Sequence, residues 1–212
     1  MWSALRTATA LLGVAGTALA DGEPAGGHDH YVLALSWQPA WCAVEGDARD
    51  ARSCGRSGLG WTLHGLWPQY EDGWPSWCPT DRSGPTGREV AAMEDVMGSP
   101  TLAGHQWRKH GTCSGLSGPD YLALSRLAYE SVVRPGILRR IEEPMRIPAT
   151  VIEEAFLEAN PAMSADGVAI TCRDGRILEA RICLTRELEP RACSGRTARD
   201  CALTDPVFEP LR

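Results

Sequence analysis

The sequence predicts an α+β fold in which several helices pack against an antiparallel sheet. Short β-prone runs and segments of helical spacing are mixed, without the regular strand–helix–strand alternation that a parallel sheet requires. Two of the runs, 168–173 and 177–184, are joined by Asp174-Gly175, the strongest hairpin signal in the chain. With 212 residues, of which 43% are hydrophobic and 23% charged, the chain suits a single globular domain.

The first 20 residues are typical of a secretory signal. Arg6 precedes a small, apolar run from Ala8 to Leu19, and residues 18–20 form an A-x-A cleavage site. We expect removal after Ala20, a single mature domain over 21–212, and a secreted or periplasmic location. The apolar run is too short to span a bilayer, and no later stretch is apolar enough, so no membrane contact is expected.

All eight cysteines fall in the expected mature part. An even number of cysteines after an export signal indicates disulfides in an oxidising compartment. Counting leaves their connectivity open. A structural zinc site would favour close C-x-x-C pairs, and the sequence has none. The formal charge of −6 argues against a protein that coats nucleic acid through its overall charge.

The elements expected in the first half are a loose tail (21–29), a central strand (31–37), a polar loop (42–58) and a second strand (59–64). His28 and His30, at the end of the tail, are expected to be solvated. The second strand is expected to break at Gly65 and to end by Pro68, which leaves His64 at its C-terminal end.

The second half is expected to hold most of the helices. In order, we expect a surface loop (70–85), helices (86–97, 101–110, 120–133 and 148–160), the hairpin and an irregular, bridged tail. Pro148 suits a helix start, and Asn160 followed by Pro161 suits a helix stop.

The run from His105 to Cys113 is the most informative stretch. Within six positions it carries two histidines, a glutamine and the only lysine of the chain, namely His105, Gln106, Lys109 and His110. On a helix these form two i,i+4 pairs on one side, and Gly111 is well placed to end the helix. Such a face offers two groups that can move a proton near neutral pH and a fixed positive charge, which suits a phosphoryl group.

A second motif, His64-Gly-Leu-Trp-Pro68, supplies another imidazole. Two imidazoles on opposite sides of a bound group can take and give a proton, as phosphodiester cleavage through a neighbouring hydroxyl requires. This motif, followed by Lys109-His-Gly-Thr-Cys113, resembles the two active-site segments of the ribonuclease T2 family, the secreted acid endoribonucleases. The run 31–37 resembles that family's first strand, and the cysteine order is also similar, so the resemblance spans most of the mature chain.

The resemblance implies a role for each residue. His110 would take the proton from the ribose 2′-hydroxyl, His64 would protonate the leaving 5′-oxygen, Lys109 would stabilise the transition-state charge, and His105 would bind the phosphate. Single-stranded RNA would be cleaved through a 2′,3′-cyclic phosphate to 3′-phosphate ends. Because the substrate supplies the nucleophile, no metal or cofactor is needed and DNA should be inert.

The resemblance also implies base contacts and a disulfide pattern. Trp67 would pack beside a catalytic histidine or the base, Gln69 and Trp74 would contact the base, and a packing role for Trp77 stays open. The implied disulfides are Cys42–Cys54, Cys78–Cys113, Cys172–Cys201 and Cys183–Cys193. We expect a monomer whose partner is RNA.

One position departs from the family pattern, and two rival hypotheses follow. Where the family usually carries glutamate this chain has Gln106, which can donate a hydrogen bond to a phosphoryl oxygen but cannot ionise. Our hypothesis is that activity survives, reduced or with a shifted pH profile; the alternative is a catalytically weakened RNA-binding or interaction protein. A zinc cage of the three histidines His64, His105 and His110 is the other rival. The ammonium of Lys109 and the lack of a carboxylate in either segment disfavour it.

Overall fold

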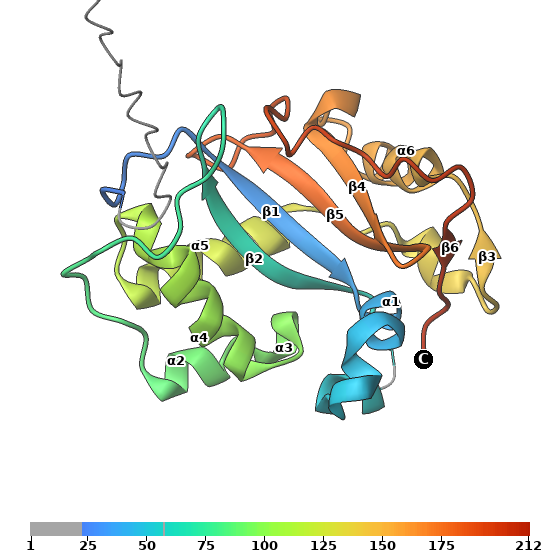
Figure 1. Cartoon of the computed structure of the whole chain (residues 1–212), viewed down its shortest axis with the longest axis horizontal. Coiled ribbons are helices and arrows are strands. Elements are labelled where there is room, and N and C mark those ends of the chain that lie inside the picture. The colour runs from blue at the N-terminus through green and yellow to red at the C-terminus, as the bar shows by residue number, and fades with distance from the viewer. Residues whose placement is uncertain (1–22, 57) are drawn as a thin grey trace, which may run out of the picture.

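The structure is a computed structural model that describes residues 23–56 and 58–212; the expected signal sequence lies outside these ranges. One sheet runs through the described part of the chain, in the order β2-β1-β5-β6-β3, with β4 paired to β5 (Figure 1). Its strands are β1 (His30–Trp37), β2 (Trp61–Gln69), β3 (Met145–Arg146), β4 (Val168–Arg173), β5 (Arg176–Leu184) and β6 (Val207–Phe208). The pairs are antiparallel except for a short parallel contact between β5 and β6. The predicted α+β class is confirmed.

The described residues also form six α-helices. They are α1 (Gln38–Trp41), α2 (Gly87–Ala91), α3 (Glu94–Met97), α4 (Pro100–Lys109), α5 (Gly118–Ser131) and α6 (Ala149–Ala159). Ser117 caps the first turn of α5, and Pro148 stands just before α6, as its place in the sequence predicts. No helix in the described part is long and apolar enough to cross a bilayer.

The core lies between one face of the sheet and the helices behind it. On β1 this face carries Leu33 and Leu35, both fully buried, and α5 passes behind the sheet in Figure 1. The buried side chains of α4, α5 and α6 that complete this core include Ala103, Trp107, Tyr121, Leu122, Ile152 and Phe156. The opposite face of the central strands is therefore free to carry polar chemistry.

The hairpin of β4 and β5 follows its sequence signal closely. Asp174 and Gly175 adopt φ values of 48° and 77°, the two positive values that a type I′ turn requires. The pairing places Thr171 opposite Glu179 and Ala169 opposite Arg181.

Several predicted elements differ from the structure. The expected polar loop at 42–58 contains short turns of π and 3-10 helix, Cys42–Gly46, Asp47–Arg49 and Arg52–Gly55. The expected helix at 86–97 is divided into α2 and α3. The expected strand at 59–64 continues as β2 through Gly65 and Pro68 to Gln69. A bulge at His64, just before Gly65, lets the strand continue where the sequence suggested a break.

The prediction that His28 and His30 are solvated is wrong. Their exposed fractions are 2% and 1%. The tail is held along the sheet because the amide of Asp29 donates to the carbonyl of Gln69 at 2.8 Å. The ring of His28 packs on Tyr31 with 4.5 Å between centroids. Burial lowers the pKa of His28 to about 4, with Arg186 and His30 adding to the effect against the opposing charge of Asp29.

Four disulfides connect the cysteines in the pattern that the resemblance implies: Cys42–Cys54, Cys78–Cys113, Cys172–Cys201 and Cys183–Cys193. The second ties the loop after β2 to the segment that follows α4. The last two hold the C-terminal region against β4 and β5. Disulfides of this kind stabilise a fold chiefly by restricting the unfolded chain.

Candidate active site

His64 sits in a bulge of β2. Leu63 pairs with Leu35 and Gly65 pairs with Ala34, so His64 has no partner of its own on β1. A bulge of this kind turns a side chain away from its regular direction. His64 is 36% exposed, whereas its neighbours Leu63 and Leu66 are fully buried in the core. The strand therefore presents an accessible imidazole while remaining part of the sheet.

Trp67, three residues after His64, contacts one histidine from each motif. The ring of His64 lies edge-on to Trp67 with 5.2 Å between centroids. The ring of His110 stacks on the same indole at 5.3 Å, with 28° between the planes. Residues from β2 and from the end of α4 are thus brought together around one side chain.

Gln106, where the resemblance led us to expect glutamate, holds that indole in place. The Trp67 indole N–H donates to Gln106 Oε1 at 2.8 Å, and Gln106 is only 2% exposed. Gly65 is needed here because a Cβ would stand 2.3 Å from Gln106 Oε1 and 2.5 Å from Trp67 Nε1. The amide oxygen of Gln106 is therefore engaged with tryptophan, which the sequence did not predict.

His110 is the more buried of the two imidazoles. It is 6% exposed, and its Nδ1 is fully enclosed without a hydrogen-bond partner among the described residues. Nε2 is thus the ring nitrogen left to meet a ligand. Burial lowers the pKa of His110 to about 3, with the positive charge of Lys109, then of His64 and His105, contributing to that value. His110 is consequently a neutral base over most of the pH range.

His105 is exposed and Lys109 is half-buried on α4. Burial, followed by the charges of Lys109, Arg108 and His64, lowers the pKa of His105. Its ring lies edge-on to Trp77 at 5.8 Å, and the amide of Trp77 donates to the carbonyl of Lys109 at 2.8 Å. The loop that follows β2 is thus attached to this side of the helix.

The helix ends where it was expected to, but Gly111 has a different task. α4 stops at Lys109, and Gly111 does not adopt a positive φ. A Cβ at Gly111 would lie 2.4 Å from the ring of Trp107 and 2.7 Å from that of Tyr121. Close packing, rather than a left-handed cap, requires glycine there.

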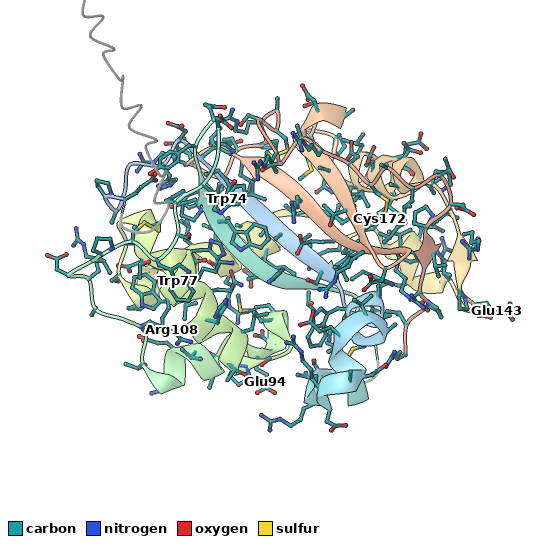
Figure 2. All side chains as sticks on the ribbon, viewed as in Figure 1. Trp74, Trp77, Glu94, Arg108, Glu143 and Cys172 are labelled. Atoms are coloured by element: carbon teal, nitrogen blue, oxygen red, sulfur yellow. A yellow bond between two sulfur atoms is a disulfide. The ribbon has the colours of Figure 1, made fainter. Side chains whose placement is uncertain are left out.

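The residues expected to contact a base differ in their exposure to solvent. Figure 2 labels Trp74 and Trp77 on the loop between β2 and α2, where they are 41% and 46% exposed. The guanidinium of Arg196 lies 5.8 Å from the Trp74 ring. Gln69 is buried, and its side-chain amide donates to the carbonyl of Pro68 at 2.9 Å. This placement favours Trp74 over Gln69 as a base contact.

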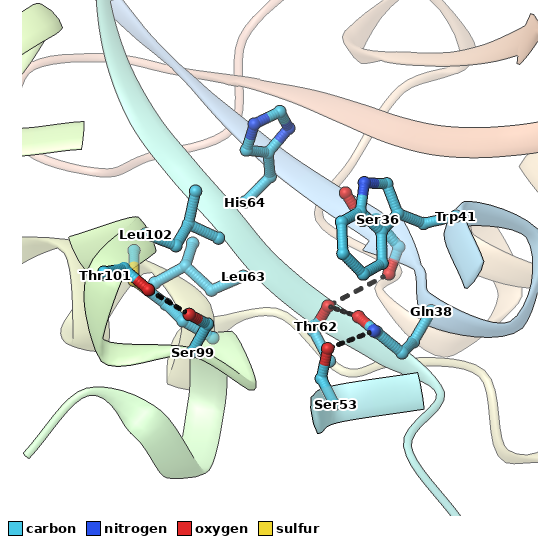
Figure 3. A pocket seen from close by; sticks show the side chains of 11 residues that line it. Ser36, Gln38, Trp41, Ser53, Thr62, Leu63, His64, Ser99, Thr101 and Leu102 are labelled. Carbon is cyan, nitrogen blue, oxygen red and sulfur yellow. Dashed lines mark hydrogen bonds between the residues drawn. The ribbon is translucent and has the colours of Figure 1, made fainter. Parts of the chain in front are cut away.

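A cavity of about 280 Å³ opens beside His64 (Figure 3). Its far wall is a polar network in which Thr62 Oγ1 donates to Gln38 Oε1 at 3.2 Å and Gln38 Nε2 donates to Ser53 Oγ at 3.0 Å. Ser99 and Thr101 form the wall on the side of α4, with 2.8 Å between their hydroxyl oxygens. Trp41, Leu63 and Leu102 supply the apolar part of the lining. An apolar lining with a few fixed polar groups suits a flat heterocycle.

Two further residues of the site, Glu179 and Arg181, were not predicted. Glu179 Oε1 accepts from His64 Nδ1 at 2.6 Å, although 115 residues separate the two in the chain. Arg181 Nε donates to the other carboxylate oxygen at 2.9 Å. A signal was present in the sequence, because two charged residues spaced by two on an apolar strand must share a face. That spacing did not reveal that Glu179 would form a hydrogen bond with His64.

The three-histidine zinc cage is not supported by the placement of its donors. Among the described residues, the one group of three or more candidate ligands within 4.8 Å of one another is Cys42, Asp47 and Cys54. Both of these cysteines are in a disulfide. His64, His105 and His110 do not gather their ring nitrogens in this way.

Comparison with known sequences finds similar proteins among the ribonucleases. The model of the ribonuclease T2 family matches residues 28–132. A ribonuclease of Aeromonas hydrophila is 44% identical over 119 residues, which is 56% of this chain and 53% of that protein. Ribonuclease DdI of Dictyostelium discoideum is 32% identical over 202 residues, 80% of this chain and 83% of that protein. The first of these alignments spans about half of the relative's length.

Comparison with solved structures agrees on the fold. An RNase-related protein from Calystegia sepium superposes with a TM-score of 0.63 at 19% identity, over 85% of this chain and 98% of that one. Trichomaglin, described as an S-like ribonuclease, superposes with the same TM-score of 0.63 at 20% identity, over 87% and 98% of the two chains. The sequence matches, the shared fold and both histidine motifs lead to one conclusion: this chain belongs to the ribonuclease T2 family.

Proposed function

We propose that this chain is an endoribonuclease that cleaves single-stranded RNA without a metal ion. The ribose 2′-hydroxyl attacks the adjacent phosphorus, the bond to the 5′-oxygen breaks, and a 2′,3′-cyclic phosphate forms that is later hydrolysed to a 3′-phosphate. Family membership supports the reaction class. The observation that carries the proposal is the placement of His64 and His110 on one indole, at 5.2 and 5.3 Å between centroids.

His110 has the properties of the base. Its pKa, lowered to about 3, leaves it neutral, and Nε2 is the nitrogen that can reach a hydroxyl. A phosphate anion bound next to the ring would favour the imidazolium that forms when the proton arrives. The same anion would be neutralised by Lys109, whose charge acts on both His105 and His110. We assign the 2′-hydroxyl proton to His110 and the phosphoryl oxygens to Lys109 and His105.

His64 has the properties of the acid. Its Nδ1–H is engaged with a carboxylate, so Nε2 is the atom left to donate to the leaving 5′-oxygen. The cavity beside His64 then lies on the leaving-group side, and we propose that it receives the nucleoside 3′ to the scissile bond. Trp74 would stack on the base at the 5′ side, together with the guanidinium of Arg196.

The test is cleavage of a short single-stranded oligoribonucleotide in excess chelator, followed by analysis of the product ends. We expect a cyclic phosphate that appears before the 3′-phosphate. An oligonucleotide with one 2′-deoxyribose is the matched control, and it should resist cleavage at that linkage alone. His64→Ala and His110→Ala should each lower the rate by about 10²–10⁴-fold. Cleavage of the 2′-deoxy linkage, or activity abolished by the chelator, would contradict the mechanism.

Export to an oxidising compartment fits this activity. The described part of the chain contains four disulfides and no unpaired cysteine. We infer a secreted or periplasmic, monomeric enzyme whose signal is removed after Ala20. N-terminal sequencing of the exported protein tests the cleavage position.

A further inference from the structure

The face of β5 that looks toward the candidate site carries a charged pair. Glu179 and Arg181 alternate with Ala180 and Ile182, whose side chains are fully buried on the core face. Glu179 is itself 5% exposed. A carboxylate this well enclosed would be costly unless it were paired and hydrogen-bonded. Both of its oxygens have a partner, His64 Nδ1 at 2.6 Å and Arg181 Nε at 2.9 Å.

Small residues on β1 make this contact possible. β1 lies between β2 and β5, so His64 and Glu179 are two strands apart. Ser36 stands between Thr62 and Glu179, and Ala34 stands between Gly65 and Arg181. A bulky side chain at either position of β1 would occupy the space through which the carboxylate reaches the imidazole. The register and the bulge together bring Glu179 to His64.

We propose that Glu179 is the positioning residue for His64. It accepts the Nδ1 proton, fixes the ring and its tautomer, and so presents Nε2–H to the leaving oxygen. Arg181 in turn orients the carboxylate, and its guanidinium lies 5.5 Å from the ring of Trp67. This inference rests on the proposed function of His64 as the acid.

The proton balance assigns no proton to Glu179. As the phosphorus–oxygen bond breaks, the Nε2 proton of His64 moves to the 5′-oxygen, and the Nδ1 proton stays between His64 and the carboxylate. The carboxyl must therefore remain ionised. Burial alone would raise the pKa of Glu179, but the hydrogen bond and charge of His64, joined by those of Arg181, outweigh burial and lower it. The role parallels that of the carboxylate that orients histidine in hydrolase triads.

A pair of substrates separates positioning of the acid from a general loss of structure. The first is a dinucleoside monophosphate, whose alkoxide leaving group needs a proton. The second is a nucleoside 3′-(p-nitrophenyl phosphate), whose leaving group departs without one. We expect Glu179→Gln to lower kcat on the dinucleotide by about 10–100-fold, as replacing the partner that orients a metal-bound histidine does. The rate on the aryl ester should change by less than about threefold.

Glu209→Gln is the matched control. Glu209, just after β6, accepts from Arg176 of β5 at 2.8 Å, so the variant removes another carboxylate that is paired with an arginine of β5, without touching His64. It should cleave both substrates like wild type. Equal losses of Glu179→Gln on both substrates, or no loss on either, would overturn the proposal. If His64→Ala cleaves the dinucleotide at the wild-type rate, the proposed function of His64 itself is wrong, and this inference fails with it.

A measurement on the unmodified protein makes the test independent of how the variant folds. The ¹⁵N shifts of the His64 ring, recorded at a pH where the ring is neutral, report which nitrogen carries the proton. We expect the proton on Nδ1, facing Glu179, whether or not the protein cleaves RNA. A proton on Nε2 in wild type would overturn the positioning role even if the enzyme is active.

Discussion

Replacing Gln106 by glutamate restores the residue that the family usually carries and changes one charge in the site. Gln106 Oε1 already accepts the Trp67 indole N–H at 2.8 Å, and a carboxylate can accept the same bond. The indole stacked on His110 should therefore stay in place. The new charge lies one helical turn before His110. It should stabilise the imidazolium and raise the pKa of His110 from about 3.

The size of the shift follows from Coulomb's law. Side chains at i and i+4 of a helix are about 6 Å apart. With an effective dielectric constant of about 20 to 40, unit charges at that separation interact by roughly 1.4–2.8 kcal/mol. One pKa unit corresponds to about 1.4 kcal/mol, so the pKa should rise by about 1–2 units. Because the base acts when neutral, activity should appear about 1–2 pH units higher in the variant.

The assay is kcat/KM for a dinucleoside monophosphate across the acidic limb of the pH profile, for wild type, Gln106→Glu and Gln106→Met. Methionine is similar in length but neutral, and it cannot accept the indole hydrogen bond as the amide does. It separates the loss of that bond from the gain of charge. We expect the methionine variant to lose rate without a shift of the limb, and the glutamate variant to shift the limb upward.

Two results would refute this reasoning. A limb that stays in place, or moves to lower pH in Gln106→Glu, would mean that His110 is not the group whose protonation abolishes activity. Wild type that is inactive until glutamate is introduced would favour the alternative of a catalytically weakened protein. Cleavage by wild type at acidic pH would instead show that the amide suffices at this position.

Three further predictions concern stability. Serine at both Cys78 and Cys113, whose separation is 35 residues, should cost about 4 kcal/mol in urea unfolding; a loss under about 1 kcal/mol would contradict the restriction of the unfolded chain. His28 has its folded pKa lowered from 6.5 to about 4, so the unfolded state binds the proton first. As the pH falls from 6.5 to about 4, the free energy of unfolding should therefore drop by up to about 3 kcal/mol. A His28→Asn variant with the same dependence of stability on pH would exclude His28 as the cause. Trp67→Phe leaves a buried acceptor on Gln106 unpaired, so the unfolding free energy should drop by roughly 1–3 kcal/mol; an unchanged midpoint would exclude that cost.

The sequence predicted the parts of the fold that local chemistry determines. The turn at Asp174-Gly175 needs two positive φ values, and those residues tolerate them. The end of α4 fell within a residue of its expected place. The two motifs also located His64 and His110, and the structure places both against Trp67. Local signals were sufficient wherever neighbours in the chain decide the conformation.

The rest depended on contacts between distant segments. The tail with His28 and His30 looked solvated because polar residues near a terminus usually are, but backbone bonds to Gln69 and Cys113 hold it down. The acceptor role of Gln106 required knowing that β2 brings Trp67 beside α4. Glu179 required both the order of the strands and their register. Neither can be read from the sequence of one strand alone.

The bulge in β2 explains how one strand can contribute to both the core and the candidate site. Leu63 and Leu66 are three residues apart, yet both are fully buried and pair with Leu35 and Leu33 of β1. In a regular strand, residues three apart point to opposite faces. The extra residue at His64 lets both leucines stay in the core while His64 and Trp67 face the site. Gly65, where the strand was expected to break, follows this bulge directly, and the strand continues past it with its leucines in the core and His64 and Trp67 facing the site.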